Sequence, residues 1–226
     1  WGYFPSFSGA WRVSNEKFMK DIKWIDDLKI RGGWGQTGNQ SGLGDYSYLA
    51  RYNINRVQWF GEGNDANSTP TSSQGNLSNP ELTWETTTQT NIGLDLTVLG
   101  NRLTFYADYY YKKTKDMLMN ITLPTGGAAA SNLTYNGGSM INKGWEFAIS
   151  SQNLTGALKW NTDFNISFNK NKLESLSLTQ VYYEATTTDF VNEQVVRNTP
   201  GKPLGSFWGY VAEGVDPETG DMKYKD

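Results

Sequence analysis

Apolar and polar side chains alternate with a period of two along most of this chain. Six stretches show the pattern: residues 3–13, 28–37, 91–98, 102–112, 143–150 and 158–169. Residues 91–98 illustrate it, since one face is aliphatic and consists of Ile92, Leu94, Leu96 and Val98. Neighbouring side chains of a β-strand point to opposite faces, whereas a helix repeats every 3.6 residues. The sequence therefore predicts six strands, each with one mainly apolar and one more polar face.

The turn at Gly100-Asn101 tests this interpretation. If these two residues form a tight hairpin turn, Val98 lies opposite Leu103 and Thr97 lies opposite Thr104. The same register pairs apolar residues on one face: Leu96 with Phe105, Leu94 with Ala107 and Ile92 with Tyr109. One register thus satisfies both faces, as a half-buried hairpin requires.

Short and long connections alternate along the chain. Residues 99–101 and 152–157 are tight, whereas residues 38–82, 113–137 and 172–203 are long and rich in Asn, Ser, Thr and Gly. We expect a short helix between Ser14 and Asp27, capped by Ser14 and placed at the same end as the tight turns. Its apolar side would hold Phe18, Ile22 and Ile25. Short turns at one end and long loops at the other are typical of an outer-membrane barrel.

Composition excludes several classes of function. The 226 residues include no Cys and no His, which excludes disulfides, thiolate or histidine metal sites and Ser-His-Asp catalysis. A net charge of −3 gives no electrostatic footprint for nucleic acid. Aromatic residues make up 14% of the chain, which argues against disorder. No run of apolar residues is long enough for a transmembrane helix, but a transmembrane strand needs no such run.

The two faces leave open a barrel and a soluble β-sandwich or β-helix. The polar face carries Arg31, Asp95, Arg102, Asp108, Glu146, Lys159 and Asp163. These side chains would meet solvent in a β-sandwich or β-helix and a wet lumen in a barrel. Lipid-facing or girdle positions in a barrel would be Trp11, Trp34, Leu94, Leu96, Phe105, Tyr109, Tyr111, Trp145 and Trp160.

Six sequence blocks, in order, resemble a known family. They are WGYFPS with AWRVS (residues 1–14), LKIR with GQTGNQ (28–40), NPELTWETT with QTNIGLD (79–95), NRL with DYY and KTKD (101–116), NKGWE (142–146) and GKPLGSFWGY (201–210). Together these blocks are similar to the SusC/RagA-type TonB-dependent outer-membrane transporters of Bacteroidetes. The least family-like parts are residues 41–76 and 178–198.

The resemblance implies an all-β fold, part of an antiparallel transmembrane barrel of about 22 strands around a plug. Residues 1–226 would be an internal piece of the barrel domain, with about six strands and neither the plug nor the remaining strands. The implied function is TonB-dependent uptake of oligomeric nutrients, glycan or peptide, across the cell outer membrane. The implied partners are a SusD-like surface lipoprotein, TonB-ExbB-ExbD acting through the plug, the substrate, and outer-membrane lipid.

Substrate contacts are expected on the long loops. The aromatic candidates are Tyr46, Tyr48, Trp59, Phe60, Tyr135, Tyr182 and Tyr183, which could stack on sugar or peptide, pack within their loops or contact the lipoprotein. An acidic tail holds Asp216, Glu218, Asp221 and Asp226. In family members such a stretch runs into a calcium-loop-like motif, of which Asp226 could be the first position; a solvated turn is the alternative. No other cofactor is expected.

No catalytic residue is predicted. Asp26 and Asp27 are expected to end the short helix, and Glu81 and Glu85 match a transporter strand, so neither pair indicates a glycosidase. The alternative function is a soluble extracellular β-sandwich that binds carbohydrate. The sequence leaves open whether residues 204–212 form a membrane strand.

Overall fold

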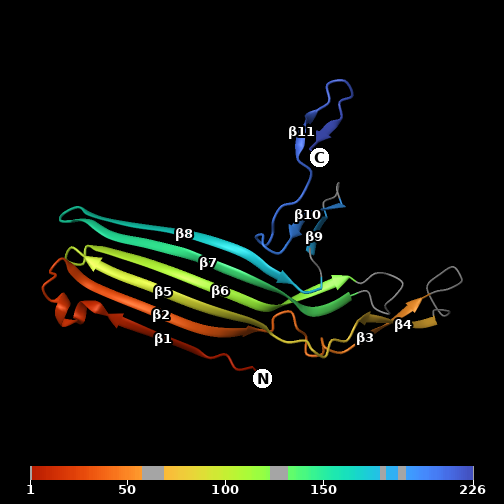
Figure 1. The fold of residues 1–226 in the computed structure, drawn as a ribbon, viewed down its shortest axis with the longest axis horizontal. Coiled ribbons are helices and arrows are strands. Elements are labelled where there is room, and N and C mark those ends of the chain that lie inside the picture. The colour runs from red at the N-terminus through yellow and green to blue at the C-terminus, as the bar shows by residue number, and fades with distance from the viewer. Residues whose placement is uncertain (1, 58–68, 123–131, 179–181, 188–191, 226) are drawn as a thin grey trace.

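The chain forms one long antiparallel sheet with smaller hairpins at one of its ends. The computed structural model describes residues 2–57, 69–122, 132–178, 182–187 and 192–225. Six strands lie in the order β1-β2-β5-β6-β7-β8 (Figure 1). Their bounds are β1 Ser6–Arg12, β2 Ile25–Asn39, β5 Glu85–Val98, β6 Leu103–Thr122, β7 Asn132–Thr155 and β8 Lys159–Leu176. All six predicted strands are confirmed, and each neighbouring pair is antiparallel.

The predicted register of the β5–β6 hairpin is confirmed. Val98 pairs with Leu103 and Thr97 with Thr104, and the pairing runs unbroken to Thr86 opposite Lys115. Backbone angles with positive φ at Leu99, Gly100 and Asn101 close the turn. The same pairing continues across the sheet, so that whole rows of side chains share a face. One apolar row consists of Ile92, Tyr109, Trp145 and Phe168.

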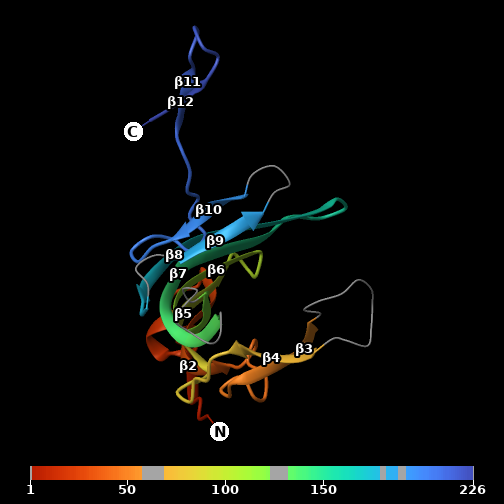
Figure 2. The ribbon, with the colours of Figure 1, turned by 90° about the vertical axis from the view of Figure 1, so that its right-hand side faces the viewer.

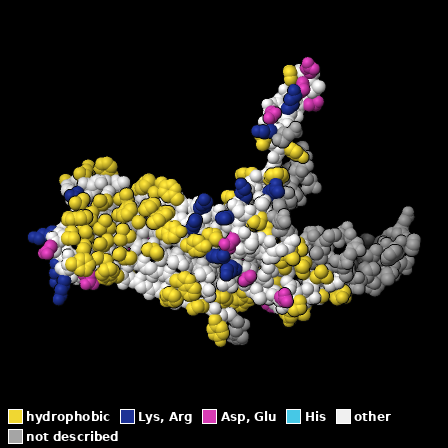
Figure 3. Space-filling view, in the orientation of Figure 1, with side chains coloured by type: hydrophobic (Ala, Val, Ile, Leu, Met, Phe, Trp, Pro, Cys, Tyr) yellow, Lys and Arg dark blue, Asp and Glu magenta, His cyan; other side chains and the backbone are white. Residues whose placement is uncertain are grey.

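The sheet is curved (Figure 2), and its apolar face is uncovered in the described residues. Among the described residues, the only buried hydrophobic ones are Val13, Tyr135 and Leu173. By contrast, Trp145, which lies inside this apolar row, is 49% exposed. Figure 3 shows the large hydrophobic surface that results. Monomeric soluble proteins rarely expose so large a continuous apolar area, so this face requires a partner surface or lipid.

The connection between β1 and β2 differs from the predicted helix. It holds two short 3-10 turns, η1 Val13–Asn15 and η2 Lys17–Met19, and β2 then begins at Ile25. The Ser14 hydroxyl donates to Asp27 Oδ1 at 2.7 Å and does not cap a helix. Asp26 and Asp27 therefore lie within a strand and do not end a helix. No helix in the part of the chain described here is long and apolar enough to cross a membrane.

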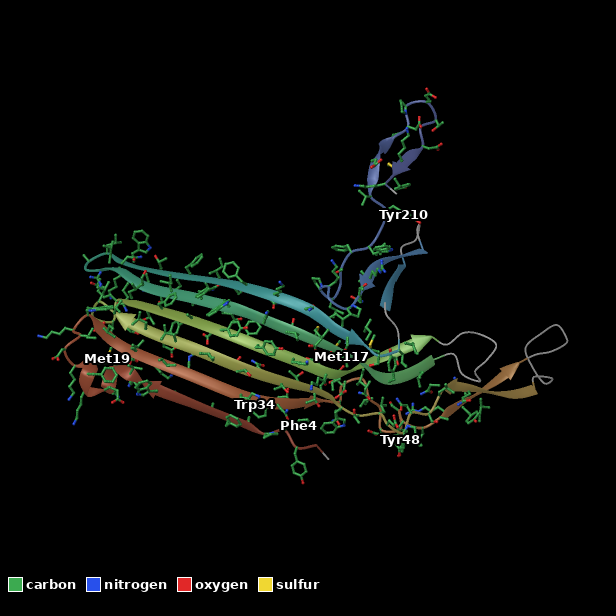
Figure 4. All side chains as sticks on the ribbon, viewed as in Figure 1. Phe4, Met19, Trp34, Tyr48, Met117 and Tyr210 are labelled. Carbon is green, nitrogen blue, oxygen red and sulfur yellow. The ribbon has the colours of Figure 1, made fainter. Side chains whose placement is uncertain are left out.

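The tight turns share one end of the sheet, as predicted. The β1–β2 connection, with Met19, and the β5–β6 and β7–β8 turns gather there (Figures 1 and 4). The Asp26 carboxylate accepts a hydrogen bond from the Asn101 amide at 2.8 Å, which ties the β2 end to the next turn.

The opposite end is more regular than the predicted long loops. The strands β6, β7 and β8 extend well beyond their predicted ends, and residues 38–82 contain a hairpin of β3 Arg51–Val57 and β4 Thr69–Asn76. Residues 172–203 include the β9 Tyr182–Thr187 and β10 Asn192–Asn198 hairpin. The β6–β8 extensions contain apolar residues such as Met117, Met119 and Leu133, but register shifts between Thr114 and Leu118 and between Ser139 and Met140 break the alternation along them.

Residues 204–212 do not join the six-stranded sheet. Phe207 forms an isolated bridge with Val196, and the chain then leads to a hairpin of β11 Ala212–Val215 and β12 Met222–Tyr224. This hairpin stands away from the main sheet, beyond Tyr210 (Figures 1 and 4).

The observed register predicts that cysteines introduced at Thr97 and Thr104 would form a disulfide. The hydroxyl oxygens of these paired residues are 3.4 Å apart, and cross-strand Cα separations of about 4.5–5.5 Å suit a disulfide. We expect T97C/T104C to crosslink under mild oxidation, seen as a thiol count of zero after unfolding. T97C/F105C, which mimics a one-residue slip, should keep both thiols free; the opposite result would disprove this register.

Candidate functional site

An ion network crosses the polar inner face of the sheet. Arg31 of β2 donates from Nε to Asp95 Oδ1 on β5 at 2.9 Å and from Nη2 to Asp108 Oδ2 on β6 at 2.7 Å. Lys29 Nζ lies 3.6 Å from Asp95 Oδ2. One guanidinium therefore ties three strands together. The partly exposed geometry keeps the desolvation of these charges small.

The glycine between Arg31 and Asp108 makes this contact possible. Gly93 on β5 is the backbone partner of both residues. A Cβ at Gly93 would lie 2.5 Å from Asp108 Oδ1 and 2.7 Å from Arg31 Cζ. The absence of a side chain lets the guanidinium lie across the middle strand, as glycine within a strand often permits.

A second glycine, on β7 two strands further on, allows the same kind of contact across a strand. Gly144 of β7 pairs with Tyr110 of β6 and with Asn169 of β8. The Tyr110 ring lies over Gly144, and its hydroxyl donates to Asn169 Oδ1 at 3.0 Å. A Cβ at Gly144 would lie 2.8 Å from the Tyr110 hydroxyl and would also press on the Phe168 carbonyl oxygen. Arg31 and Tyr110 thus each link three neighbouring strands on the inner face, and we call these two contacts braces.

A shallow hollow lies between the two braces. It is lined mainly by Arg31, Asn91, Asp108, Tyr110, Lys112 and Glu146. Asp108 and Glu146 are direct cross-strand partners, and Glu146 forms no ion pair among the described residues. The hollow therefore offers hydrogen-bond donors and acceptors of both charges, which suits a polar ligand or a polar segment of protein.

Side-chain hydrogen bonds fix the end of the sheet at which the long connections lie, which we call the rim. Asn136 of β7 donates to the carbonyls of Thr83 and Asp116, both at 2.8 Å, and accepts from the Thr83 amide at 2.9 Å. Asn79 Nδ2 donates to the Thr134 carbonyl at 3.0 Å. Glu85 accepts from the Leu118 amide at 2.8 Å. The segment that leads into β5 is therefore fixed against the β6–β7 extension.

A second rim segment docks against the end of β8. Asn198, 1% exposed, accepts from the Gly205 amide at 2.7 Å, and Asn171 accepts from the Leu204 amide at 2.8 Å. The Leu173 amide donates to the Lys202 carbonyl at 2.9 Å. These bonds attach the GKPLG stretch to the sheet and set where the chain leaves it.

Comparison with known proteins identifies the family of this sheet. The family model described as "TonB dependent receptor-like, beta-barrel" matches residues 1–217. The chain belongs to the TonB-dependent receptor β-barrel family. It is 37% identical over 181 residues to the TonB-dependent receptor SusC of Bacteroides thetaiotaomicron, covering 78% of this chain and 18% of that protein. It is 35% identical over 218 residues to the TonB-dependent receptor P3 of Formosa agariphila, covering 95% and 21%.

Solved structures of this family have the same fold. A structure of the RagAB peptide transporter matches with a TM-score of 0.80 and 26% identity, over 98% of this chain and 23% of that chain. A closed-closed state of the RagAB peptide importer matches with a TM-score of 0.79 and 24% identity, over 99% and 24%. The chain spans about a fifth of the length of the curated relatives named above.

Membership of this family places the sheet in the cell outer membrane as part of an antiparallel β-barrel. The resemblance to SusC/RagA-type transporters is confirmed. The register puts the predicted lipid-facing residues on a single face of the sheet: Trp11, Trp34, Leu94, Leu96, Phe105, Tyr109, Tyr111, Trp145 and Trp160. Their contact with lipid stays a prediction.

The structure separates the predicted substrate-contact residues. Tyr46 and Tyr48 are exposed beside the rim, and the Tyr48 carbonyl accepts from the Asn79 amide at 3.0 Å (Figure 4). Tyr135 is only 6% exposed, so its side chain does not offer a free surface to a ligand. Trp59 and Phe60, and the side chains of Tyr182 and Tyr183, lie outside the described residues.

Asp216 of the acidic tail serves a hairpin turn. Its carboxylate lies 2.9 Å from Lys223 Nζ and accepts from the Glu218 amide at 2.9 Å. The Lys223 hydrogen bond, helped by the backbone amides, lowers the pKa of Asp216 below its usual value. Within the described ranges, no three acidic residues are close enough to hold a metal ion. Asp226 lies outside them, and calcium stays a prediction.

Sequence reasoning placed the charged residues on the inner face but missed the glycine braces. Such a contact can be recognised from a glycine within a strand. The residue opposite it on one neighbouring strand has a long polar side chain, and the residue opposite it on the other neighbouring strand has a hydrogen-bond acceptor. This recognition requires knowing that β2 lies beside β5, across a connection of 45 residues, from 40 to 84.

Gly93→Ala should disrupt the Arg31 brace. The new methyl group would separate Arg31 from Asp108, and we expect a loss of roughly 1–2 kcal/mol in the free energy of unfolding, measured in urea. Gly9→Ala is the matched control, since nothing lies within 4 Å of a Cβ there. The loss should shrink in an Asp108→Ser background; equal losses at Gly93 and Gly9 would contradict the brace.

Proposed function

We propose that this chain forms part of the wall of a TonB-dependent transporter that takes up oligomeric nutrients, glycan or peptide. The supporting observation is the two-faced sheet, in which one register gives a continuous apolar outer face and an ion-paired inner face. Residues 1–226 would supply about six of roughly 22 strands, with the plug and the other strands in the rest of the protein.

The two faces would have separate tasks. The outer face would meet hydrocarbon, where each apolar side chain is favoured and each charge is disfavoured. The inner face would line a wet lumen, in which the braces at Gly93 and Gly144 keep the wall in one shape. The wall supplies shape and polar contacts, and we propose no covalent chemistry for it.

The rim would face the outside of the cell. Short turns lie at the periplasmic end of such barrels and longer loops at the extracellular end. Tyr46 and Tyr48 would be placed to stack on a nutrient or on a SusD-like lipoprotein lid. The similarity to SusC and to the RagAB peptide transporter supports this class of cargo and partner. Energy would come from TonB-ExbB-ExbD through the plug.

The alternative, a soluble β-sandwich that binds carbohydrate, is not favoured. A sandwich covers its apolar face with a second sheet about 10 Å away. In the described parts of this chain the small hairpins lie beyond the end of the sheet, and the apolar rows stay open (Figures 1 and 3).

Spin labels test the assignment of the two faces. We expect labels at Leu94 and Phe105 in the membrane-inserted full-length protein to be accessible to oxygen and protected from a water-soluble nickel complex. Labels at Tyr106, the residue after Phe105, and at Asn165, in the same inward row as Tyr106, should show the reverse. Uniform accessibility at all four positions would rule out a barrel wall.

An arginine introduced on each face tests the same assignment through its effect on the free energy of unfolding. Ile166 lies between Phe164 and Phe168 among the outward apolar positions of β8, so Ile166→Arg should lower the unfolding free energy in lipid by roughly 2–4 kcal/mol. Asn165→Arg, on the inner face of the same strand, should change it by less than about 0.5 kcal/mol. Equal effects at both positions would count against an outer face in hydrocarbon.

A further inference from the structure

The outward face changes abruptly from aromatic to cationic on β6, β7 and β8. Its last fully apolar row on these strands is Tyr109, Trp145 and Phe168. The next row is Tyr111, Lys143 and Lys170, and the one after it is Lys113, Ile141 and Lys172. We call Lys143, Lys170 and Lys172 the lysine cluster. Dark-blue groups border the hydrophobic surface on this side in Figure 3.

The cluster lies at the edge of the apolar belt. On β8 and its turn the outward apolar positions run from Leu158 to Phe168. Ten residue steps of about 3.4 Å, tilted by roughly 40°, span about 26 Å, which matches the apolar band of about 25 Å in such barrels. Lys170 is the next outward residue. The lysine ammonium groups therefore lie at headgroup level, at the end of the belt away from the tight turns.

The charge of the cluster is only partly compensated, since Glu174 attracts Lys172 without forming an ion pair with it. Lys143 and Lys170 are direct cross-strand partners, a placement in which like charges repel. Glu174 lies nearby, but it pairs with Lys113 at 2.5 Å. Among the described residues, none of the three cluster lysines has a carboxylate within 4.0 Å, and all three are exposed. An external anion would relieve this repulsion.

The charge is confined to one part of the belt edge. The row that holds Lys143 and Lys170 continues across the sheet as Tyr111, Thr90, Trp34 and Phe7, all uncharged. Trp34 and Phe7 stack there with ring centroids 5.0 Å apart. The cationic stretch is thus a localised feature of β7 and β8 beside an aromatic girdle.

We propose that the lysine cluster binds the phosphate group of an anionic lipid in the leaflet at the long-loop end. The lipid chains would lie on the row of Tyr109, Trp145 and Phe168, and the ammonium groups would hold the phosphate directly above. The proposal rests on the barrel wall proposed above and adds a specific lipid contact to it.

Lipid retention by the full-length protein tests the cluster. The protein would be placed in nanodiscs of phosphatidylcholine with 20 mol% phosphatidic acid, released, and examined by native mass spectrometry. We expect wild type to retain phosphatidic acid selectively. K143Q/K170Q/K172Q should lose roughly 100-fold in affinity for it, about five-fold for each lysine.

The control is K112Q/K159Q/K225Q, which removes the same charge from the inner face and the terminal hairpin and should bind as wild type does. K143R/K170R/K172R should restore binding, because it keeps the charge. Equal retention by wild type and the cluster variant would overturn the proposal, as would full competition by 10 mM inorganic phosphate, which would indicate a free anion in place of a lipid.

Heat-modifiable migration separates this proposal from the barrel itself. A cluster variant that still shifts on boiling but no longer retains phosphatidic acid supports the lipid site. A variant that still shifts and retains the lipid overturns the site while leaving the barrel wall intact. If wild type itself does not shift on boiling, the barrel wall fails and the lipid site fails with it.

Discussion

The pairing of β5 with β6 determines which way every side chain in the sheet points. A slip of one residue would place Leu94 on the same face as Tyr106 and Asp95 on the same face as Phe105, so that one of the two strands would turn its polar residues to the outer face. Charges at the middle of hydrocarbon cost several kcal/mol each, so such a slip is strongly disfavoured in lipid. The turn at Leu99–Asn101 and the chemistry of the two faces specify the same register independently.

Glycine gives the inner face its cross-strand contacts. Ordinary cross-strand pairs join neighbouring strands, but Arg31 and Tyr110 each span three strands because Gly93 and Gly144 leave the middle position empty. In a sheet with almost no buried core of its own, such contacts resist shear between strands. A lumen also suits them, because partly hydrated ion pairs avoid the desolvation penalty of a dry interior.

The sequence predicted the strands and the hairpin register because two independent signals, alternation and turn chemistry, agreed there. The helix at residues 14–27 was wrong because so short a segment has little intrinsic helical stability, and because Ser14 bonds to Asp27 of β2 and does not cap a helix. The strand extensions were missed because register shifts between Thr114 and Leu118 and between Ser139 and Met140 break the alternation there. The burial of Tyr135 depends on tertiary packing around the β6–β7 extension, which no local pattern encodes.

The two ends of the sheet follow from different forces. At the tight-turn end, local chemistry suffices, as the Ser14–Asp27 and Asp26–Asn101 hydrogen bonds show. At the rim, the side chains of Asn79, Asn136 and Asn198 hold the irregular backbone. They donate hydrogen bonds to main-chain carbonyls or accept them from main-chain amides that are not paired between strands. Amide side chains suit this task because they offer donor and acceptor together. A wall with a self-sufficient base and a rim fixed by such contacts can vary its outer loops without disturbing the strands beneath, which explains why the least family-like residues, 41–76 and 178–198, flank the rim.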